Sequence, residues 1–491
     1  MATVPQTVPQ NMLRPLVLPF GYDLAPPRQS YITFVPAVLV LTGILSWVMG
    51  DELGMVLAAT VASVLGLYTL WNWVFRKAPT RFSTLLAMAL LLGYGVGTLN
   101  TWITLPRGSL SIAELMGLPE GMLARGMGAV LISSATLFFL GEIYERPLFG
   151  REFRVYIDQR TRILIRVGML GMLGGYITHS LSLGGPSTGG GHVSIAGLFL
   201  TWLYTPLTAI SVAAFLTAER RQDRIIDGLT ALILLMMFSV LGRRVAIYTS
   251  VEVLFMLRLI GFRWQGSLVR KVLLILGLGT IAVACSLTFM LLRMAGSTQP
   301  KTVMPVEKRL EVASNMVQKG GAYAMAAHVT QVNLQTRTFI LSFFAYVLDS
   351  SSRMTPALGQ DTLGMLQLSV PSVLYPGKNP YFSEEALVDQ QFHLAYGDQP
   401  NSILTAGATD FGLVGVILFP PLIVFLSKSV FNLIARWFRP IPLLIVALSF
   451  ILMMVVTEST LNGYFEVIRN SCIFGALLQL FVSMPGIRLK A

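Results

Sequence analysis

Apolar residues along this chain gather in long runs that are separated by short polar connections. Each run has roughly 20 residues, the length that carries an α-helix across the hydrocarbon core of a bilayer. The pattern predicts twelve such helices. They cover residues 30–49, 53–75, 82–103, 122–141, 163–182, 194–217, 225–242, 245–262, 271–293, 408–427, 440–457 and 467–485.

One long polar segment interrupts the series between the ninth and tenth predicted helices. Helices embedded in lipid form a single bundle, so the chain is predicted to be an all-α polytopic membrane protein with one transmembrane domain. Its predicted parts are a tail over 1–29, nine spans over 30–293, a large loop over 294–407, and three spans with a short end over 408–491.

Composition and charge support this class and set the orientation. Hydrophobic residues make up 54% of the chain and charged residues 12%, which is typical of membrane proteins. The net charge of +12 does not indicate nucleic-acid binding, because the basic residues are not clustered with aromatic residues in a soluble module. Most Lys and Arg residues fall in alternate connections, which predicts cytoplasmic N- and C-termini and an extracytoplasmic loop over 294–407.

Three arginines, Arg243, Arg244 and Arg469, lie in short outer connections and run against this charge bias. Arg243 and Arg244 open the eighth predicted helix, where backbone N–H groups and the helix dipole favour an anion. Arginine adds paired donors that match phosphate oxygens. We interpret the pair as a phosphate clamp, with simple anchoring at the membrane interface as an equally weighted alternative.

Two further sets of charged residues follow a helical spacing. Arg244, Tyr248 and Glu252 recur every four residues and so share one face. A carboxyl group deep in a bilayer is functional or internally paired, and pairing of Glu252 with a neighbouring helix is favoured over catalysis. Arg469 follows Glu466 by three residues, which indicates a surface ion pair.

The large loop contains two predicted helices. Residues 306–318 have the mixed pattern of a short surface helix, and residues 338–348 form an apolar run too short to span a bilayer. The second segment is expected to lie in the interface or to pack on the bundle. Arg337 and Arg353 flank it, where they can contact a lipid phosphate or anchor the segment.

The histidines and the glycine-rich stretch give no cofactor signature. No histidine pair has metal-ligand spacing, so no metal site is predicted, and His328 or His393 is instead a candidate general base. The stretch 184–192 lacks the Lys and Ser/Thr of a phosphate loop. It is interpreted as a loop that lines a cavity.

Three stretches occur in order around the large loop: SVLGRRVAIYTSVEVL before it, VPSVLYPGKNPYF within it, and QPNSILTAGATDFGLVG at its end. Together they resemble the Wzy-type polysaccharide polymerases, which join oligosaccharide repeat units carried on undecaprenyl diphosphate. Ser372 follows Pro371 where this family often has Arg. Asn401 and its neighbours stand where the related O-antigen ligases usually carry a His-Asn pair, which favours a polymerase over a ligase.

The resemblance implies a GT-C-like membrane glycosyltransferase of the bacterial inner membrane, with undecaprenyl-diphosphate-linked oligosaccharides as donor and acceptor. No cofactor is needed, since the donor is already activated. The implied partners are these lipid-linked glycans, membrane lipids, a chain-length regulator and a flippase. A ligase-like enzyme and a non-enzymatic carrier remain the alternatives. The candidate diphosphate-binding residues are Arg243, Arg244, Lys378, Arg353 and Arg337, the candidate bases are His328, His393 and Asp410, and the secondary candidates are Tyr248, Glu252 and Arg469.

Overall fold

The computed structural model describes most of the chain. The described residues are 29–76, 78–104, 110–115, 117–119, 121–148, 155–178, 181–182, 185–186, 195–237, 243–262, 276–277, 280, 284, 287–292, 294–295, 306–318, 320–322, 324–328, 340–371, 374–375, 377, 384–393 and 400–483.

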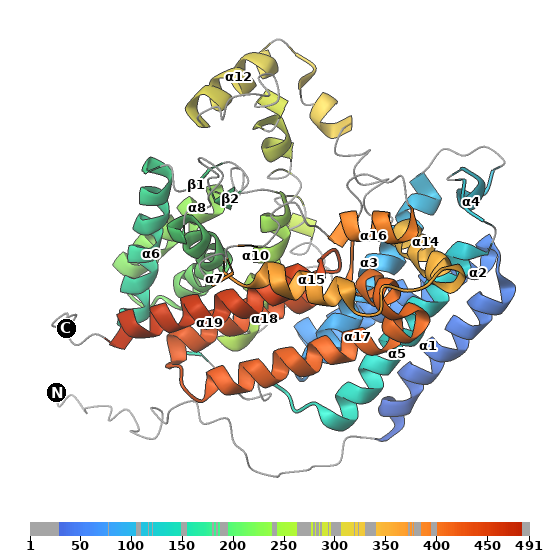
Figure 1. Cartoon of the computed structure of the whole chain (residues 1–491). Coiled ribbons are helices and arrows are strands. Elements are labelled where there is room, and N and C mark those ends of the chain that lie inside the picture. Colours follow the sequence, from blue (N-terminus) through green and yellow to red (C-terminus); the bar gives the residue numbers. More distant parts are fainter. Residues whose placement is uncertain are drawn as a thin grey trace.

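Helices form almost all of the described structure, so the predicted all-α class is confirmed (Figure 1). Two strands of two residues each, β1 (Leu181–Ser182) and β2 (Gly185–Pro186), pair antiparallel near the glycine-rich stretch. The helices are α1 (Gln29–Met49), α2 (Glu52–Phe75), α3 (Phe82–Thr104), α4 (Ile112–Leu115), α5 (Met122–Tyr144), α6 (Gln159–Ile177), α7 (Ile195–Thr217), α8 (Arg221–Met236), α10 (Arg243–Leu259), α12 (Val306–Gln318), α14 (Ile340–Arg353), α15 (Gln360–Ser369), α16 (Glu384–Phe392), α17 (Ile403–Ala435), α18 (Pro440–Val455) and α19 (Leu461–Ser483).

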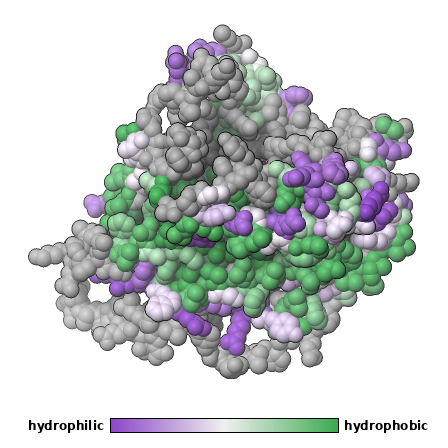
Figure 2. Space-filling model, in the orientation of Figure 1, coloured by the Kyte–Doolittle hydropathy of each residue, from purple (hydrophilic) through white to green (hydrophobic). Residues whose placement is uncertain are grey.

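Six helices in the described part of the chain are long and apolar enough to cross a membrane, namely α2, α3, α5, α7, α17 and α19. The apolar parts of α1 and α18 are shorter. Helices α6, α8 and α10 match predicted spans in position, whereas the predicted span 271–293 falls largely outside the described residues. Figure 2 shows an apolar belt across α17 and α19 with hydrophilic residues on either side, as expected for a protein embedded in lipid.

Different polar contacts join the helices at the two ends of the bundle. At one end Arg81 binds the carboxylate of Glu142 at 2.5 Å, and Arg258 donates to the carbonyl oxygens of Trp73 and Ala78. At the other end Trp102 donates to Glu52, and the helices of the large loop pack there. We call this second end the loop end. Because Arg258 is in the last turn of α10, the start of that helix points towards the loop end.

The helices of the large loop behave as their sequence patterns predict. Helix α12 spans the predicted 306–318. Helix α14 buries Ile340, Phe344 and Val347 against α3, α5 and α17, so the described part of the apolar run, residues 340–348, packs on the bundle. The loop end therefore carries a layer of short helices that covers the transmembrane helices.

Helix α17 begins at Ile403, earlier than the predicted start of the tenth span at 408, and it is broken inside. Phe411 and Gly412 leave helical geometry, and Gly412 has φ of +58°, a value that favours glycine. The two halves approach so closely that a Cβ on Gly415 would overlap the carbonyl oxygen of Gly407. The glycines of the loop-closing sequence thus allow a sharp bend between two packed half-helices.

Candidate functional site

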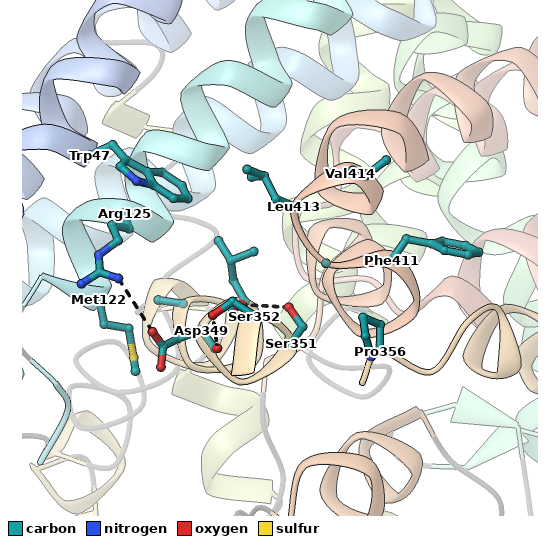
Figure 3. Close-up of a pocket in the computed structure, with 13 residues that line it drawn as sticks. Trp47, Met122, Arg125, Asp349, Ser351, Ser352, Pro356, Phe411, Leu413 and Val414 are labelled. Atoms are coloured by element: carbon teal, nitrogen blue, oxygen red, sulfur yellow. Dashed lines mark hydrogen bonds and ion pairs between the residues drawn. The ribbon is translucent and has the colours of Figure 1, made fainter. Parts of the chain in front are cut away.

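A cavity of about 360 Å³ lies at the loop end, between α1, α5, α14 and α17 (Figure 3). Its walls are mostly apolar, and its polar groups come from the start of α5 and from α14. The lining residues are Trp47, Met122, Arg125, Ala345, Leu348, Asp349, Ser351, Ser352, Pro356, Phe411, Gly412, Leu413 and Val414.

One arginine and one carboxylate, Arg125 and Asp349, line this cavity, and a second arginine, Arg353, pairs with Asp349. Asp349 pairs with Arg353, 2.8 Å away on the same helix. It also faces Arg125, 4.0 Å away on α5 (Figure 3). The Asp349 side chain is 12% exposed, whereas those of Arg125 and Arg353 are 47% and 63% exposed. The charged groups at and beside the cavity thus sum to a positive charge, with two partly exposed guanidinium groups around a largely buried carboxylate.

The break in α17 adds a second electropositive element. We call the part of α17 before the break its upper half and the part after the break its lower half. The lower half begins at Gly412, Leu413 and Val414, and these residues line the cavity. The first N–H groups of a helix have no intrahelical acceptor, and such a start favours a nearby anion. The cavity therefore combines apolar walls with several donors suited to a phosphate group.

Asp410 anchors α15 beside this cavity. Its buried carboxylate accepts hydrogen bonds from the backbone N–H groups of Gly359, Asp361 and Thr362, at 2.9–3.1 Å, and from the Thr362 hydroxyl. A carboxylate at a helix start offsets the helix dipole and satisfies its N–H groups. The carbonyl of Asp410 also accepts from the N–H of Leu358, so α15 and the upper half of α17 cap one another.

Arg469 holds the other end of α15. Its guanidinium donates to the carbonyl oxygen of Ser369 at 2.7 Å, while Glu466 is 3.8 Å away. A cation at a helix C-terminus complements the dipole. The predicted Glu466–Arg469 pair exists, but the closer contact of Arg469 is with α15. Arg469 thus has a positioning role in the loop layer.

A second group of carboxyls lies beneath α15. Asp361 is fully buried, and neither of its side-chain oxygens has a hydrogen-bond partner. Burial, with the nearby carboxylates of Glu384 and Asp410, raises the pKa of Asp361 to about 10. Glu384 accepts from the N–H of Leu461 at the start of α19. Asp361 is therefore neutral at neutral pH, and the group serves to join α15, α16 and α19.

The predicted bases lie in different surroundings. The Asp410 carboxylate already accepts four hydrogen bonds. His393 is exposed just after α16, with φ of +53°, and its neighbour Gln391 donates to the carbonyl of Thr355 at the edge of the cavity. His328 is exposed next to a small apolar cluster, separate from the main core, that includes Ala326. None of the three lines the cavity.

Of the predicted arginines, Arg353 does not line the cavity but forms an ion pair with Asp349, which does. Arg243 and Arg244 form the first turn of α10, but their side chains lie outside the described residues, as do Arg337 and Lys378 entirely. Their predicted diphosphate contacts stay predictions.

The two secondary candidates on α10 are both described. Glu252 is fully buried beside Thr205, a polar residue of the neighbouring helix α7, and its expected pairing with a polar group of a neighbouring helix stays a prediction. Tyr248 is half-buried on the same helix.

Sequence analysis does not single out Arg125 or Asp349. A usable signal exists for Arg125, since it stands at the outer start of an otherwise apolar predicted span and so runs against the charge bias. Asp349 and Arg353 are four residues apart, a spacing that favours an ion pair on one helix face. That these two elements meet can be seen only in three dimensions.

Among the described residues, no three His, Cys, Asp or Glu side chains gather as metal ligands. Comparison with known proteins finds no matching family model, no matching curated protein and no matching solved structure.

Proposed function

We propose that this protein is a membrane glycosyltransferase that polymerises undecaprenyl-diphosphate-linked oligosaccharide repeat units at the outer face of the bacterial inner membrane. In this proposal the bundle has a GT-C-like architecture of the Wzy type, both termini are cytoplasmic, and the loop end faces outward. The observation that carries it is the mostly apolar cavity at the loop end, which Arg125 lines and whose Asp349 pairs with Arg353.

The shape and chemistry of the cavity fit the head of a lipid diphosphate. Phe411 and Val414 line it and yet remain 44% and 61% exposed, so the cavity borders the apolar outer surface of α17. A polyprenyl chain can approach along that surface without leaving the membrane. The diphosphate then meets Arg125 and Arg353, whose planar donors bind paired phosphate oxygens.

Glycosyl transfer from such a donor needs stabilisation of the leaving diphosphate. Preorganised positive groups aimed at developing negative charge lower the barrier of such a step. Arg125, Arg353 and the start of the lower half of α17 provide these groups here. Four further candidates for the same role have side chains that the structure does not describe. They are Arg243, Arg244, Lys378 and Arg337.

The loop-closing sequence supports a polymerase over a ligase. It has Asn401 and Ser402 where ligases usually carry His-Asn, and both residues are buried, with Ser402 bonded to Tyr94 at 2.6 Å. A carrier would also bind a lipid diphosphate, so activity must separate these functions. A chain-length regulator and a flippase are the expected protein partners of a polymerase.

The test is to incubate purified protein with a synthetic polyprenyl-diphosphate repeat unit and to resolve the lipid-linked glycans by size. A ladder of longer glycans is expected from the wild type. Arg125→Ala and Arg353→Ala should each lower ladder formation at least about tenfold, since each loses a charge-assisted contact of about 1.5–3 kcal/mol. Arg160→Ala, an exposed arginine at the start of α6, is the matched control.

Two results would argue against this function. Movement of the lipid across a vesicle without any ladder would identify a carrier. Transfer of one glycan to a different lipid acceptor, with no further growth, would identify a ligase-like enzyme.

A further inference from the structure

Asp349 is the one carboxylate among the residues that line the cavity. It projects from α14 towards Arg125 of α5, as Figure 3 shows. Arg353, one turn further along α14, forms an ion pair with it. Ser351 and Ser352 line the cavity beside it, and their hydroxyls donate to carbonyl oxygens of α14. Asp349 is thus a single acid set among the groups assigned to diphosphate binding.

We propose that Asp349 is the catalytic base of the transfer reaction and that the bound diphosphate releases it for this role. The inference rests on the proposed glycosyl transfer. In the structure both arginines pair with Asp349. A diphosphate offers more charge and more acceptor oxygens than one carboxylate, so the exposed guanidinium groups turn to it when the donor binds.

This exchange frees the carboxylate oxygens of Asp349 to face an acceptor hydroxyl. A carboxylate that loses neighbouring positive charges holds a proton more readily. The apolar walls strengthen the effect, because a lipid head that fills the cavity leaves little water to screen the charges. Asp349 and the two arginines therefore couple donor binding to activation of the acceptor.

The reaction balances with these groups alone. The acceptor hydroxyl oxygen forms a bond to the anomeric carbon of the donor glycan, and the bond from that carbon to the diphosphate oxygen breaks. The electron pair of the broken bond leaves with the diphosphate, whose charge Arg125 and Arg353 stabilise. The hydroxyl proton passes to the Asp349 carboxylate, and from there to water when the product leaves.

The other candidate bases are less suited to this position. The four hydrogen bonds that Asp410 accepts are needed to hold α15, and His328 and His393 do not line the cavity. Asp349 alone combines a place in the cavity with a carboxylate that a bound anion can free.

The experiment compares Asp349→Asn with the wild type in two assays. The first measures transfer at saturating donor. The second measures binding of a fluorescent polyprenyl diphosphate without a glycan. The Asn variant keeps the size of the side chain but cannot take up a proton. Transfer should fall about 10²–10⁴-fold, while the probe should bind at least as tightly, because no carboxylate competes for the arginines.

Asp349→Glu, which keeps the acid, should recover part of the transfer. Asp389→Asn, a partly exposed carboxyl on α16, is the control for the substitution itself. Weaker probe binding together with lost transfer would mean that Asp349 only holds the cavity in shape. An Asn variant that transfers within about threefold of the wild type would overturn the base role and leave the proposed function standing. A wild type without transfer would overturn both.

Discussion

Replacing Asp410 by Asn changes one atom of the side chain and removes one negative charge from the start of α15. In the structure both carboxylate oxygens act only as acceptors, and all four of their donors belong to residues 359–362. The amide of Asn keeps one accepting oxygen. Its NH₂ group, turned towards Thr362, can donate to the Thr362 hydroxyl but cannot accept from the Thr362 N–H, so one of the four hydrogen bonds must be lost.

The cost of that loss follows from the kind of bond. A hydrogen bond to a charged group contributes about 1.5–3 kcal/mol, so the loss of one costs about that much. Loss of the charge at the helix start adds up to about 1–2 kcal/mol in a buried setting. Together these losses are a large fraction of the whole stability of many domains. Asp410→Asn should therefore markedly destabilise the loop layer.

The assay is thermal unfolding in detergent, followed by the amount of monodisperse protein that remains after heating. Asp361→Asn is a matched control, because it makes the same substitution in the same group of buried carboxyls. Asp361 accepts no hydrogen bond, and its carboxyl is already neutral at neutral pH. The Asp361 variant should unfold at or above the wild-type temperature, while the Asp410 variant should unfold well below it.

An Asp410→Asn protein with wild-type thermal stability would refute this reasoning. If that stable variant had also lost transfer, Asp410 would be a base, as the sequence resemblance implies, and not a helix cap.

Two further predictions concern the bend in α17 and the dependence of stability on pH. Gly415→Ala should abolish accumulation of folded protein, because its Cβ would overlap the Gly407 carbonyl. Gly174→Ala is the control, since its Cβ meets open space and should leave the yield unchanged. Equal yields of the two variants by size-exclusion chromatography would contradict this. The pKa of Asp361 is raised from 3.8 to about 10, so the unfolded chain binds fewer protons between these values. Stability is then full below about pH 4 and falls as the pH rises towards 10, by at most about 1.4 kcal/mol per pH unit. Unfolding temperatures measured from about pH 5 to 9 should fall in the wild type and less in Asp361→Asn, and parallel curves would show that Asp361 titrates normally.

Much of the fold is predictable because it depends on composition over many residues. The apolar runs that become α2, α3, α5 and α7 are long, and no local detail is needed to place them. The short helix α12 and the packing of α14 on the bundle follow from the same patterning.

The parts that escape prediction depend on contacts between distant segments. Arg125 and Asp349 are far apart in sequence, and nothing local indicates that α5 and α14 meet at their side chains. Asp410 is a residue type that often acts as a catalytic base, but here its carboxylate accepts hydrogen bonds from the N–H groups of α15. The break at Gly412 is equally hidden, because Phe-Gly inside an apolar run is compatible with a continuous span.

The central claim is that the cavity between α1, α5, α14 and α17 holds a lipid diphosphate. It is tested most directly by crosslinking the protein to a polyprenyl diphosphate that carries a photoreactive group beside the phosphates, followed by mass spectrometry of the peptides. The account predicts labelling of peptides with Trp47, Met122 or Leu413, abolished by excess unlabelled lipid and reduced in Arg125→Ala. Specific labelling confined to the start of α10, at Arg243 and Arg244, with none in the cavity would contradict it.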